Sequence, residues 1–268
     1  MIRVFPRRTK WTPIDELAFV GDPPLFRPPE QPVMVSCAFT WDLPEARRLQ
    51  RAWATYYSNV QIGGPAFGDP GGEFIPGRFL HPHVTLTSRG CVRHCQFCVV
   101  PKREGAMREL EIRPGRNIQD NNLLACSRQH VEAVFEMLRV QNRAVTFGGG
   151  LDIRLFQRWH VDLLKGIKVS EMFFACDSDR QLKRLEKVAD MIDDFSQNQK
   201  RCYALVGYGP ETISQAEKRL GAIYDLGFLP FAMIHADISE NPFPRPDWKR
   251  AMRKWQRPAA IKAYMENR

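Results

Sequence analysis

The sequence predicts an α/β protein whose main part is an open parallel sheet, a partial (β/α)6 barrel. Three observations predict this class. From residue 83 onward, strand-like apolar segments alternate with helix-like segments six times, and strands separated by helices usually pair in parallel. A shorter strand, helix and strand pattern precedes them and predicts a short N-terminal β-α-β extension. The end of the chain is basic and predicts a helical tail.

The pattern divides the chain into three regions, residues 1–82, 83–240 and 241–268. Seven prolines stand before residue 33, and proline removes a backbone donor and blocks a regular helix or central strand. The first region is therefore predicted to contain, in order, a Pro-rich extended arm (1–32), a strand (33–40), a helix capped by Asp42 (43–57), a strand (59–65) and a Gly/Pro loop (66–80).

The second region holds the six predicted strand and helix units. Apolar, β-branched and aromatic runs predict strands that start at Val84 and then cover 118–124, 144–154, 171–177, 202–208 and 229–235. Helical spacing of apolar residues predicts helices over 129–139, 159–164, 180–195 and 211–226, the first of them capped by Ser127. In the third region we expect one basic helix, 248–256, and a short end after Pro258.

Composition and charge narrow the classes of partner. The formal net charge is +9, which favours an anionic partner such as nucleic acid, although a solvated basic surface explains it equally well. No apolar run approaches the roughly 18 residues that a membrane span needs, and no apolar stretch follows the basic start of the chain, so we expect no secretory signal. Seven cysteines, three of them clustered, do not resemble a disulfide framework and predict a cytoplasmic location.

The cysteine cluster is the strongest chemical signal in the chain. Cys91, Cys95 and Cys98 have the spacing C-x3-C-x2-C and follow an apolar run that stops at Gly90. Thiolates this close together can hold one inorganic centre. Three cysteines on a four-iron cluster would leave one iron without a protein ligand, and we expect the chemistry at that iron.

This motif, with Phe97 before its last cysteine and the segment Val-Val-Pro-Lys-Arg-Glu-Gly after it (99–105), resembles the motif of radical S-adenosylmethionine (radical SAM) enzymes. The loop is also similar to that of methylthiotransferases and cobalamin-type radical SAM enzymes. The resemblance covers about residues 83–236. It implies a partial barrel in which the three cysteines bind a 4Fe-4S cluster, SAM chelates the open iron, and a donor such as flavodoxin or ferredoxin supplies the electron. Reductive cleavage of SAM by such a cluster gives a 5'-deoxyadenosyl radical.

Two alternatives to the cluster stay open. The three cysteines could form a zinc site completed by His81, His83 or His94, or they could be buried thiols that bind nothing.

The predicted SAM-binding residues stand where strands end, because the carboxyl ends of parallel strands face the site in such folds. Asp120, Asn121 and Asn122 occupy the place where many radical SAM proteins hold the SAM amino group with Gly-Gly-Glu. An Asx turn is the alternative. Asp152 and Arg154 are predicted to share a strand face, one for the ribose diol and one for the SAM carboxylate, or else to pair with each other.

Three further residues end predicted strands. Asp177 follows the fourth strand and is expected to face the same cavity. Gly207 follows the fifth, in a segment that resembles the one flanking adenine in the radical SAM family. His235 ends the sixth and is a candidate substrate contact, although a lone histidine is more often structural.

The remaining cysteines, Cys37, Cys126, Cys176 and Cys202, are interpreted as buried apolar thiols. Only one of them lies upstream of the motif, which disfavours the second cluster of methylthiotransferases, and the absence of a D-x-H-x-x-G signature disfavours cobalamin. The Asp-Asn-Asn and Gly-Leu-Asp-Ile-Arg segments resemble those of phage-associated radical SAM proteins, which leave the substrate open.

The predicted activity is therefore that of a transferase or oxidoreductase with one cluster. The basic charge favours a nucleic acid or a nucleotide as substrate. A peptide or small metabolite is the enzymatic alternative, and a zinc-bound, basic nucleic-acid-binding module is the alternative without catalysis.

Overall fold

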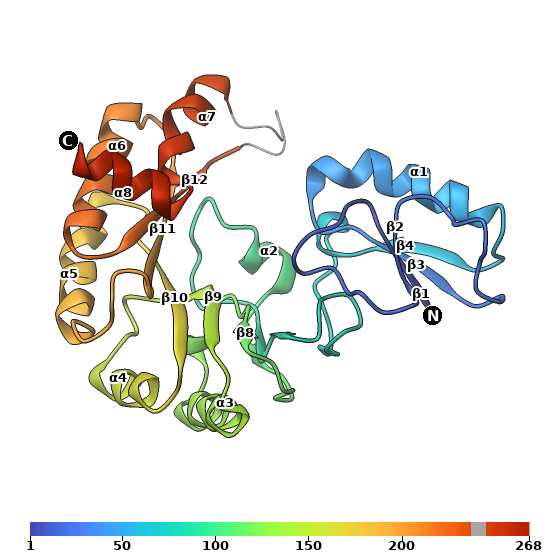
Figure 1. Ribbon diagram of the computed structural model, residues 1–268, viewed down its shortest axis with the longest axis horizontal. Helices are drawn as coiled ribbons and strands as arrows, with labels where there is room; N and C mark the ends of the chain where they lie inside the picture. The colour runs from blue at the N-terminus through green and yellow to red at the C-terminus, as the bar shows by residue number, and fades with distance from the viewer. Residues whose placement is uncertain (237–244, 268) are drawn as a thin grey trace.

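The computed structural model describes residues 1–236 and 245–267, and in these residues the protein is an α/β fold with two parallel sheets and eight α-helices (Figure 1). The predicted boundary between residues 240 and 241 lies outside the described residues. In the described part, no helix is both long enough and apolar enough to cross a membrane.

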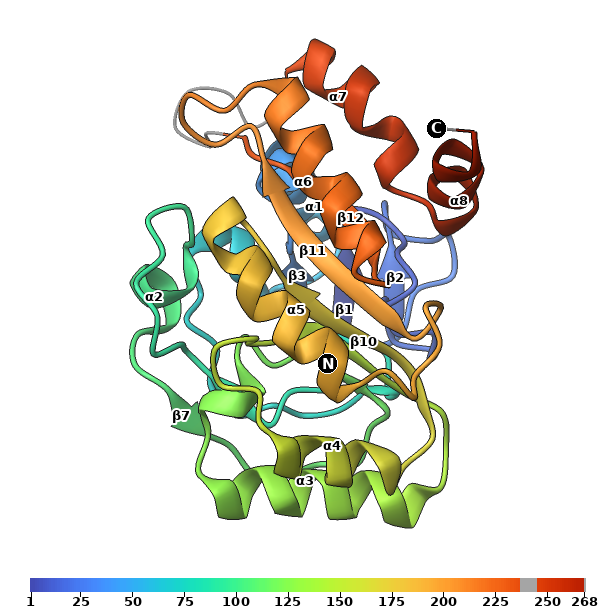
Figure 2. The ribbon, with the colours of Figure 1, turned by 90° about the vertical axis from the view of Figure 1, so that its left-hand side faces the viewer.

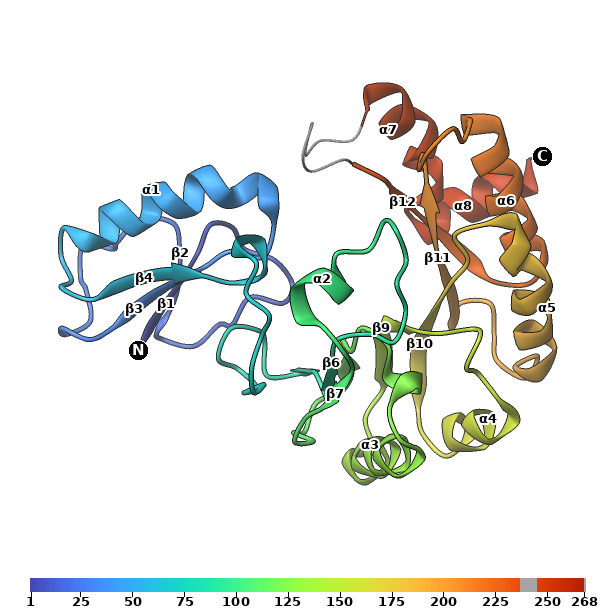
Figure 3. The same ribbon diagram turned by 180° about the vertical axis from the view of Figure 1, so that it is seen from behind.

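The N-terminal part is a four-stranded parallel sheet in the order β2-β1-β3-β4. Its strands are β1 (Ile2–Phe5), β2 (Ala18–Val20), β3 (Val33–Ser36) and β4 (Val60–Gly63). The helix α1 (Leu43–Ala54) lies along one face (Figures 1 and 3) and buries Leu49 and Trp53 against Val4 and Val35.

Two predictions for this part are corrected. The extended arm (1–32) was wrong in two places, because it contains β1, a central strand in which Ile2 and Val4 are fully buried, and the edge strand β2. The apolar run before the first proline is long enough for one short strand. The helix ends at Ala54, earlier than predicted, and Asp42 at its start does not cap it, because both carboxylate oxygens accept hydrogen bonds from Arg7.

The larger sheet has six parallel strands in the order β12-β11-β10-β9-β8-β5, so strands that follow one another along the chain within this sheet are also neighbours in it. They are β5 (Val84–Thr85), β8 (Asn117–Ile118), β9 (Val145–Leu151), β10 (Val169–Ala175), β11 (Lys200–Val206) and β12 (Leu229–Ile234). Between β5 and β8 the chain forms a small antiparallel pair, β6 (Ser88–Arg89) with β7 (Arg108–Glu109), and the short helix α2 (Val100–Glu104).

The four connecting helices cover one face of this sheet (Figure 2). They are α3 (Arg128–Gln141), α4 (Arg158–Lys165), α5 (Leu182–Met191) and α6 (Ile213–Asp225). The predictions for these helices are confirmed apart from shifts at their ends, and Ser127 caps α3 by accepting the backbone N–H of His130 at 3.2 Å. The predicted second and third strands were too long, because β8 has two residues and β9 ends at Leu151.

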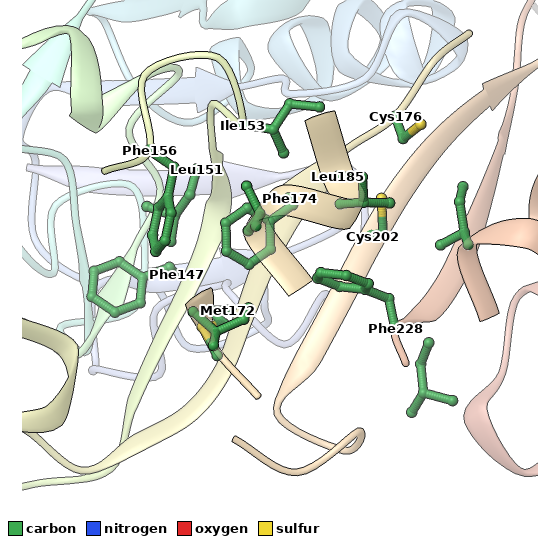
Figure 4. Packing of buried hydrophobic residues seen from close by; sticks show 14 of the residues in the cluster. Phe147, Leu151, Ile153, Phe156, Met172, Phe174, Cys176, Leu185, Cys202 and Phe228 are labelled. Atoms are coloured by element: carbon green, nitrogen blue, oxygen red, sulfur yellow. The ribbon is translucent and has the colours of Figure 1, made fainter. Parts of the chain in front are cut away.

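The main core lies between the sheet and these helices (Figure 4). Alternate residues of β10 and β11 point into it, as period two requires, and the large buried rings include Phe147, Phe174 and Phe228. Cys176 and Cys202 are fully buried in the same cluster.

The C-terminal segment packs into this core. It forms α7 (Pro246–Met252), a 3-10 turn (Arg253–Trp255) and α8 (Pro258–Glu266), and it buries Trp248, Met252, Trp255 and Ile261 in the main cluster. The short end predicted after Pro258 is instead a helix, because proline is well suited to the first helical position.

Candidate functional site

The three clustered cysteines stand on one loop between β6 and α2, and both ends of that loop are fixed. Gly90 has φ +78°, and a Cβ there would lie 2.2 Å from the carbonyl oxygen of Ala106, so only glycine fits. The N–H of Cys91 donates to the carbonyl of Gly105 at 3.4 Å. The chain thus enters and leaves the loop at neighbouring points.

Glu104 holds this junction together, and the sequence analysis assigned it no role. Its carboxylate is buried and accepts hydrogen bonds from the Gly90 N–H (3.1 Å), Asn121 Nδ2 (2.6 Å) and the Arg103 guanidinium (2.5 Å). Burial alone would raise the pKa of Glu104, but the Arg103 and Gly90 hydrogen bonds outweigh it and hold the pKa below its ordinary value. The only signal in the sequence was the place of Glu104 in the segment that follows the cysteines.

The three thiols are free and half-buried. Cys91 Sγ lies 3.4 Å from the backbone N of Arg93 and 3.7 Å from Asn122 Nδ2, both of which donate to it. Burial raises the pKa of Cys98, and the nearby sulfurs of Cys95 and Cys91 raise it further. The sulfurs of Cys95 and Cys91 are therefore close enough to Cys98 to disfavour its thiolate.

No group of three His, Cys, Asp or Glu side chains is gathered around a position for a single metal ion within residues 1–236 and 245–267. The rings of His81 and His83 lie 4.6 Å apart, and His81 Nδ1 accepts the N–H of His83. The zinc alternative therefore has no ready ligand set in the part of the chain that the structure describes.

Asp152 connects the cysteine loop to the end of β9. It accepts hydrogen bonds from Arg93 Nε (3.0 Å), Asn122 Nδ2 (3.2 Å) and Arg154 Nε (2.7 Å). Burial would raise the pKa of Asp152, but the hydrogen bonds from Arg154 and Arg93 lower it below its ordinary value. The pKa of Arg154 is raised by Asp152 and, more weakly, by the sulfur of Cys95.

The strand-face prediction for Asp152 and Arg154 is corrected by this arrangement. Because β9 ends at Leu151, Asp152 begins a turn in which its own side chain accepts the N–H of Arg154 at 2.9 Å. The two residues pair with each other, as the alternative held.

The Asp-Asn-Asn segment separates into three roles. The prediction for Asp120 is corrected, because its carboxylate is buried and accepts hydrogen bonds from the Thr87 N–H (2.8 Å), Thr87 Oγ1 (2.6 Å) and Ser88 Oγ (2.7 Å). It ties β6 to the end of β8, and burial raises its pKa. Asn121 donates to Glu104, while Asn122 reaches both Cys91 and Asp152.

Asn122 also carries a polar atom that has no hydrogen-bond partner among the described residues. Its Oδ1 is buried and has no hydrogen-bond partner there, although buried acceptors are nearly always paired. An unpaired acceptor beside the cysteine loop suits a ligand that donates a hydrogen bond, such as an ammonium group.

Asp177 and Gly207 have partners of their own. Asp177 Oδ1 accepts the N–H of Leu205 at 2.9 Å, and burial raises the pKa of Asp177. A Cβ on Gly207, which has φ +76°, would lie 3.2 Å from the indole carbons of Trp248. The packing of Trp248 therefore leaves no room for a side chain at this position, and the contact of Gly207 with adenine stays a prediction.

An aromatic row joins the cysteine loop to the ends of the last two strands. The ring of Phe97 lies edge-on to Tyr208 with centroids 5.5 Å apart, and Tyr208 lies edge-on to His235 at 5.0 Å. Tyr208 Oη also lies 3.4 Å from Gln96 Oε1. The loop thus reaches the carboxyl ends of β8, β9, β11 and β12.

The residues at this site fit the cluster that the resemblance implies. The donor set is three free thiols on one anchored loop, with N–H groups directed at Cys91, and thiolates are the ordinary ligands of iron–sulfur clusters. In a four-iron cluster each cysteine binds a different iron, so the thiols need not converge on a single ion position. The orphaned Oδ1 of Asn122 stands beside this donor set.

A comparison with protein-family models found no match to the chain, and a search of curated proteins found none either.

Proposed function

We propose that this chain is a radical SAM enzyme in which Cys91, Cys95 and Cys98 hold one 4Fe-4S cluster and SAM is the second cofactor. The observation that carries the proposal is the position of Asn122, whose amide nitrogen lies within reach of both Cys91 and Asp152 while its oxygen is buried and unpaired among the described residues. With both cofactors bound, the cluster would supply one electron for the reductive cleavage of SAM.

The chain's own residues position and shield these groups. Asn122 Oδ1 is available to accept a hydrogen bond from the amino group of SAM. Arg154 lies near Cys95 and already pairs with Asp152, so it would share its charge between Asp152 and the carboxylate of SAM. Phe97 and Tyr208 stand between the loop and the ends of β11 and β12, where they can limit the access of water.

We further propose that the six-stranded sheet is a partial (β/α)6 barrel. Its strands follow chain order, and its connecting helices cover a single face (Figure 2). The opposite face carries stacked rings of Phe173 and Tyr203, with centroids 4.6 Å apart, and an ion pair of Glu171 with Arg201. Such a mixed aromatic and charged face could receive a substrate.

A nucleic acid or nucleotide is the substrate class that we favour. Five cationic side chains on and beside α7 are exposed, namely Arg245, Lys249, Arg250, Arg253 and Arg257. A peptide or small metabolite is the second candidate, because the sheet face opposite the connecting helices does not include those five cationic side chains. Flavodoxin or ferredoxin is the proposed electron donor, and the free cysteines of the described chain agree with a reducing, cytoplasmic location.

The test is anaerobic reconstitution of the full chain with iron and sulfide, followed by reduction in the presence of SAM. We expect about four irons per chain and release of 5'-deoxyadenosine. Alanine at Cys91, Cys95 or Cys98 should abolish both. The matched control is Cys126→Ala, because burial raises the pKa of that thiol to about 12 and keeps it protonated, which makes it a poor ligand.

Two outcomes would end the proposal. One is zinc at one per chain without iron or sulfide, and the other is cleavage of SAM that survives loss of a loop cysteine.

The substrate class is tested separately by binding of single-stranded oligonucleotides. If all five exposed cations contact phosphates, the logarithm of the binding constant should fall with the logarithm of salt concentration with a slope of about −3.5.

A further inference from the structure

A cavity lies between the N-terminal sheet and the segment from β5 to α2. None of the three clustered cysteines lines it, although Arg103, Glu104 and Asn121 of the loop junction do. The volume of the cavity is about 650 Å³, which is within the range of small-molecule sites. Phe5, Ser36 and Gly63 line it at the carboxyl ends of β1, β3 and β4, and Leu86 and Arg89 line it from the other side. The bordering elements can be followed in Figure 3.

The topology of the N-terminal sheet favours ligand binding at this edge. After β1 the chain adds β2 on one side and then crosses to add β3 on the other side. In open parallel sheets, ligands bind outside the carboxyl ends of the strands at the point where the strand order reverses. The cavity occupies that position, next to Phe5 and Ser36.

Arg89 supplies a cation whose one carboxylate partner is distant and shared with other donors. Its side chain is only 19% exposed, and its nearest carboxylate oxygen, Glu104 Oε1, is 3.9 Å away. Glu104 is already occupied by Arg103 and other donors. Within the described ranges, Arg89 Nε is buried and has no hydrogen-bond acceptor.

Arg7 differs from Arg89 in this respect. Arg7 also lines the cavity, but it is paired with Asp42. The backbone of Gly71 packs against the Arg89 guanidinium, because a Cβ on Gly71 would lie 2.7 Å from Arg89 Cζ. A mostly buried guanidinium with an unused Nε on a cavity wall is suited to a carboxylate or phosphate.

We propose that this cavity binds a small organic anion, a carboxylate or a phosphate ester, whose charged group pairs with Arg89 and whose apolar or aromatic body lies against Phe5, Phe39 and Phe74. The ring of Phe39 lines the cavity and is stacked on Trp41 at 4.8 Å, so it offers a preformed flat surface. This site requires neither a cluster nor SAM, and it stands or fails independently of the radical chemistry.

The experiment is isothermal titration of the full, metal-free chain at low salt with two matched pairs of probes. Adenosine 5'-monophosphate is compared with adenosine, and benzoate with benzamide, so that the two arms separate a phosphate from a carboxylate. We expect at least one anion to bind ten-fold or more tightly than its neutral partner. Arg89→Met should remove that difference, whereas Arg139→Met, at an exposed arginine on α3, should leave it unchanged.

Two further variants keep the result decisive if Arg89→Met folds poorly, which thermal unfolding will reveal. Arg89→Lys keeps the charge but loses the two-pronged hydrogen bonding and should weaken the anion several-fold. Ser36→Phe fills the cavity and should weaken the anion and its neutral partner alike. The proposal is overturned if neither anion is preferred over its neutral partner, or if the preference is undiminished in both Arg89→Met and Arg89→Lys.

Discussion

Replacing Glu104 by glutamine should destabilise the protein by more than the same replacement at an exposed glutamate does. The side chain is 1% exposed and its carboxylate accepts hydrogen bonds from Gly90, Arg103 and Asn121. Hydrogen bonds to a charged group contribute about 1.5–3 kcal/mol each, and removing one partner of a buried ion pair costs about 3–5 kcal/mol. Because glutamine keeps one acceptor oxygen, we expect a loss of about 2–3 kcal/mol in the free energy of unfolding.

The assay is urea unfolding followed by circular dichroism, with Glu111→Gln as the matched control. Glu111 pairs with Arg113 but its side chain is 60% exposed, so its loss should cost under about 1 kcal/mol. The pKa of Glu104 is lowered in the folded state, so the carboxylate stabilises the fold above its unfolded pKa, and this contribution is lost as pH falls through the folded value. The difference between wild type and variant should therefore shrink in acid. Equal losses for the two variants at pH 7 would refute the reasoning.

Three other predictions follow from single contacts. Gly207→Ala should lower the free energy of unfolding by about 2–4 kcal/mol, because the new Cβ meets the Trp248 indole at a positive φ. Gly209→Ala is also at a positive φ but has open space around it, and it should cost only about 1–2 kcal/mol. Equal thermal shifts for the two variants would exclude the indole as the cause. Asp152→Asn leaves two guanidinium groups without their carboxylate and should cost about 2 kcal/mol, with a lower iron content after reconstitution; an unchanged unfolding free energy and iron content would contradict this. Burial lowers the pKa of His160 from 6.5 to about 4, so the folded state favours the neutral ring and the protein loses stability as pH falls from 6.5 towards 4. In the variant His160→Gln the side chain can still cap the helix but does not titrate. The thermal midpoint of this variant should therefore fall less between pH 7 and pH 5 than that of the wild type.

The long strands could be predicted from the sequence because each is an apolar run that must be buried. β9, β10, β11 and β12 have six or seven residues, and the predictions overlap all of them. β5 and β8 have two residues each, too few for a periodic pattern, and their extent is set by which neighbour they pair with. β1 and β2 were missed because they have only four and three residues and lie in the proline-rich segment, where proline argues against strands.

The candidate site divides along a similar line. The rule that polar residues gather at strand ends holds for Asn122 and Asp152, which meet beside the cysteine loop because the topology of a parallel sheet brings those ends together. Their contact with SAM stays a prediction. The rule fails for Asp120, because the hydroxyl groups of Thr87 and Ser88 bind its carboxylate. Such competition among neighbours for one acceptor depends on three-dimensional packing and leaves no trace in spacing.

The anchoring of the cysteine loop bears on when the loop becomes ordered. Glu104 holds its first residue through the Gly90 N–H, and Asp152 holds its middle through Arg93. Both carboxylates have lowered pKa values, so both anchors persist at neutral pH and weaken together in acid. Neither anchor uses a cysteine sulfur. We therefore expect this loop to be ordered before a cluster binds, in contrast to small zinc domains that are unfolded without their ion. Acidification should release the loop even where the main core, built from uncharged side chains, remains intact.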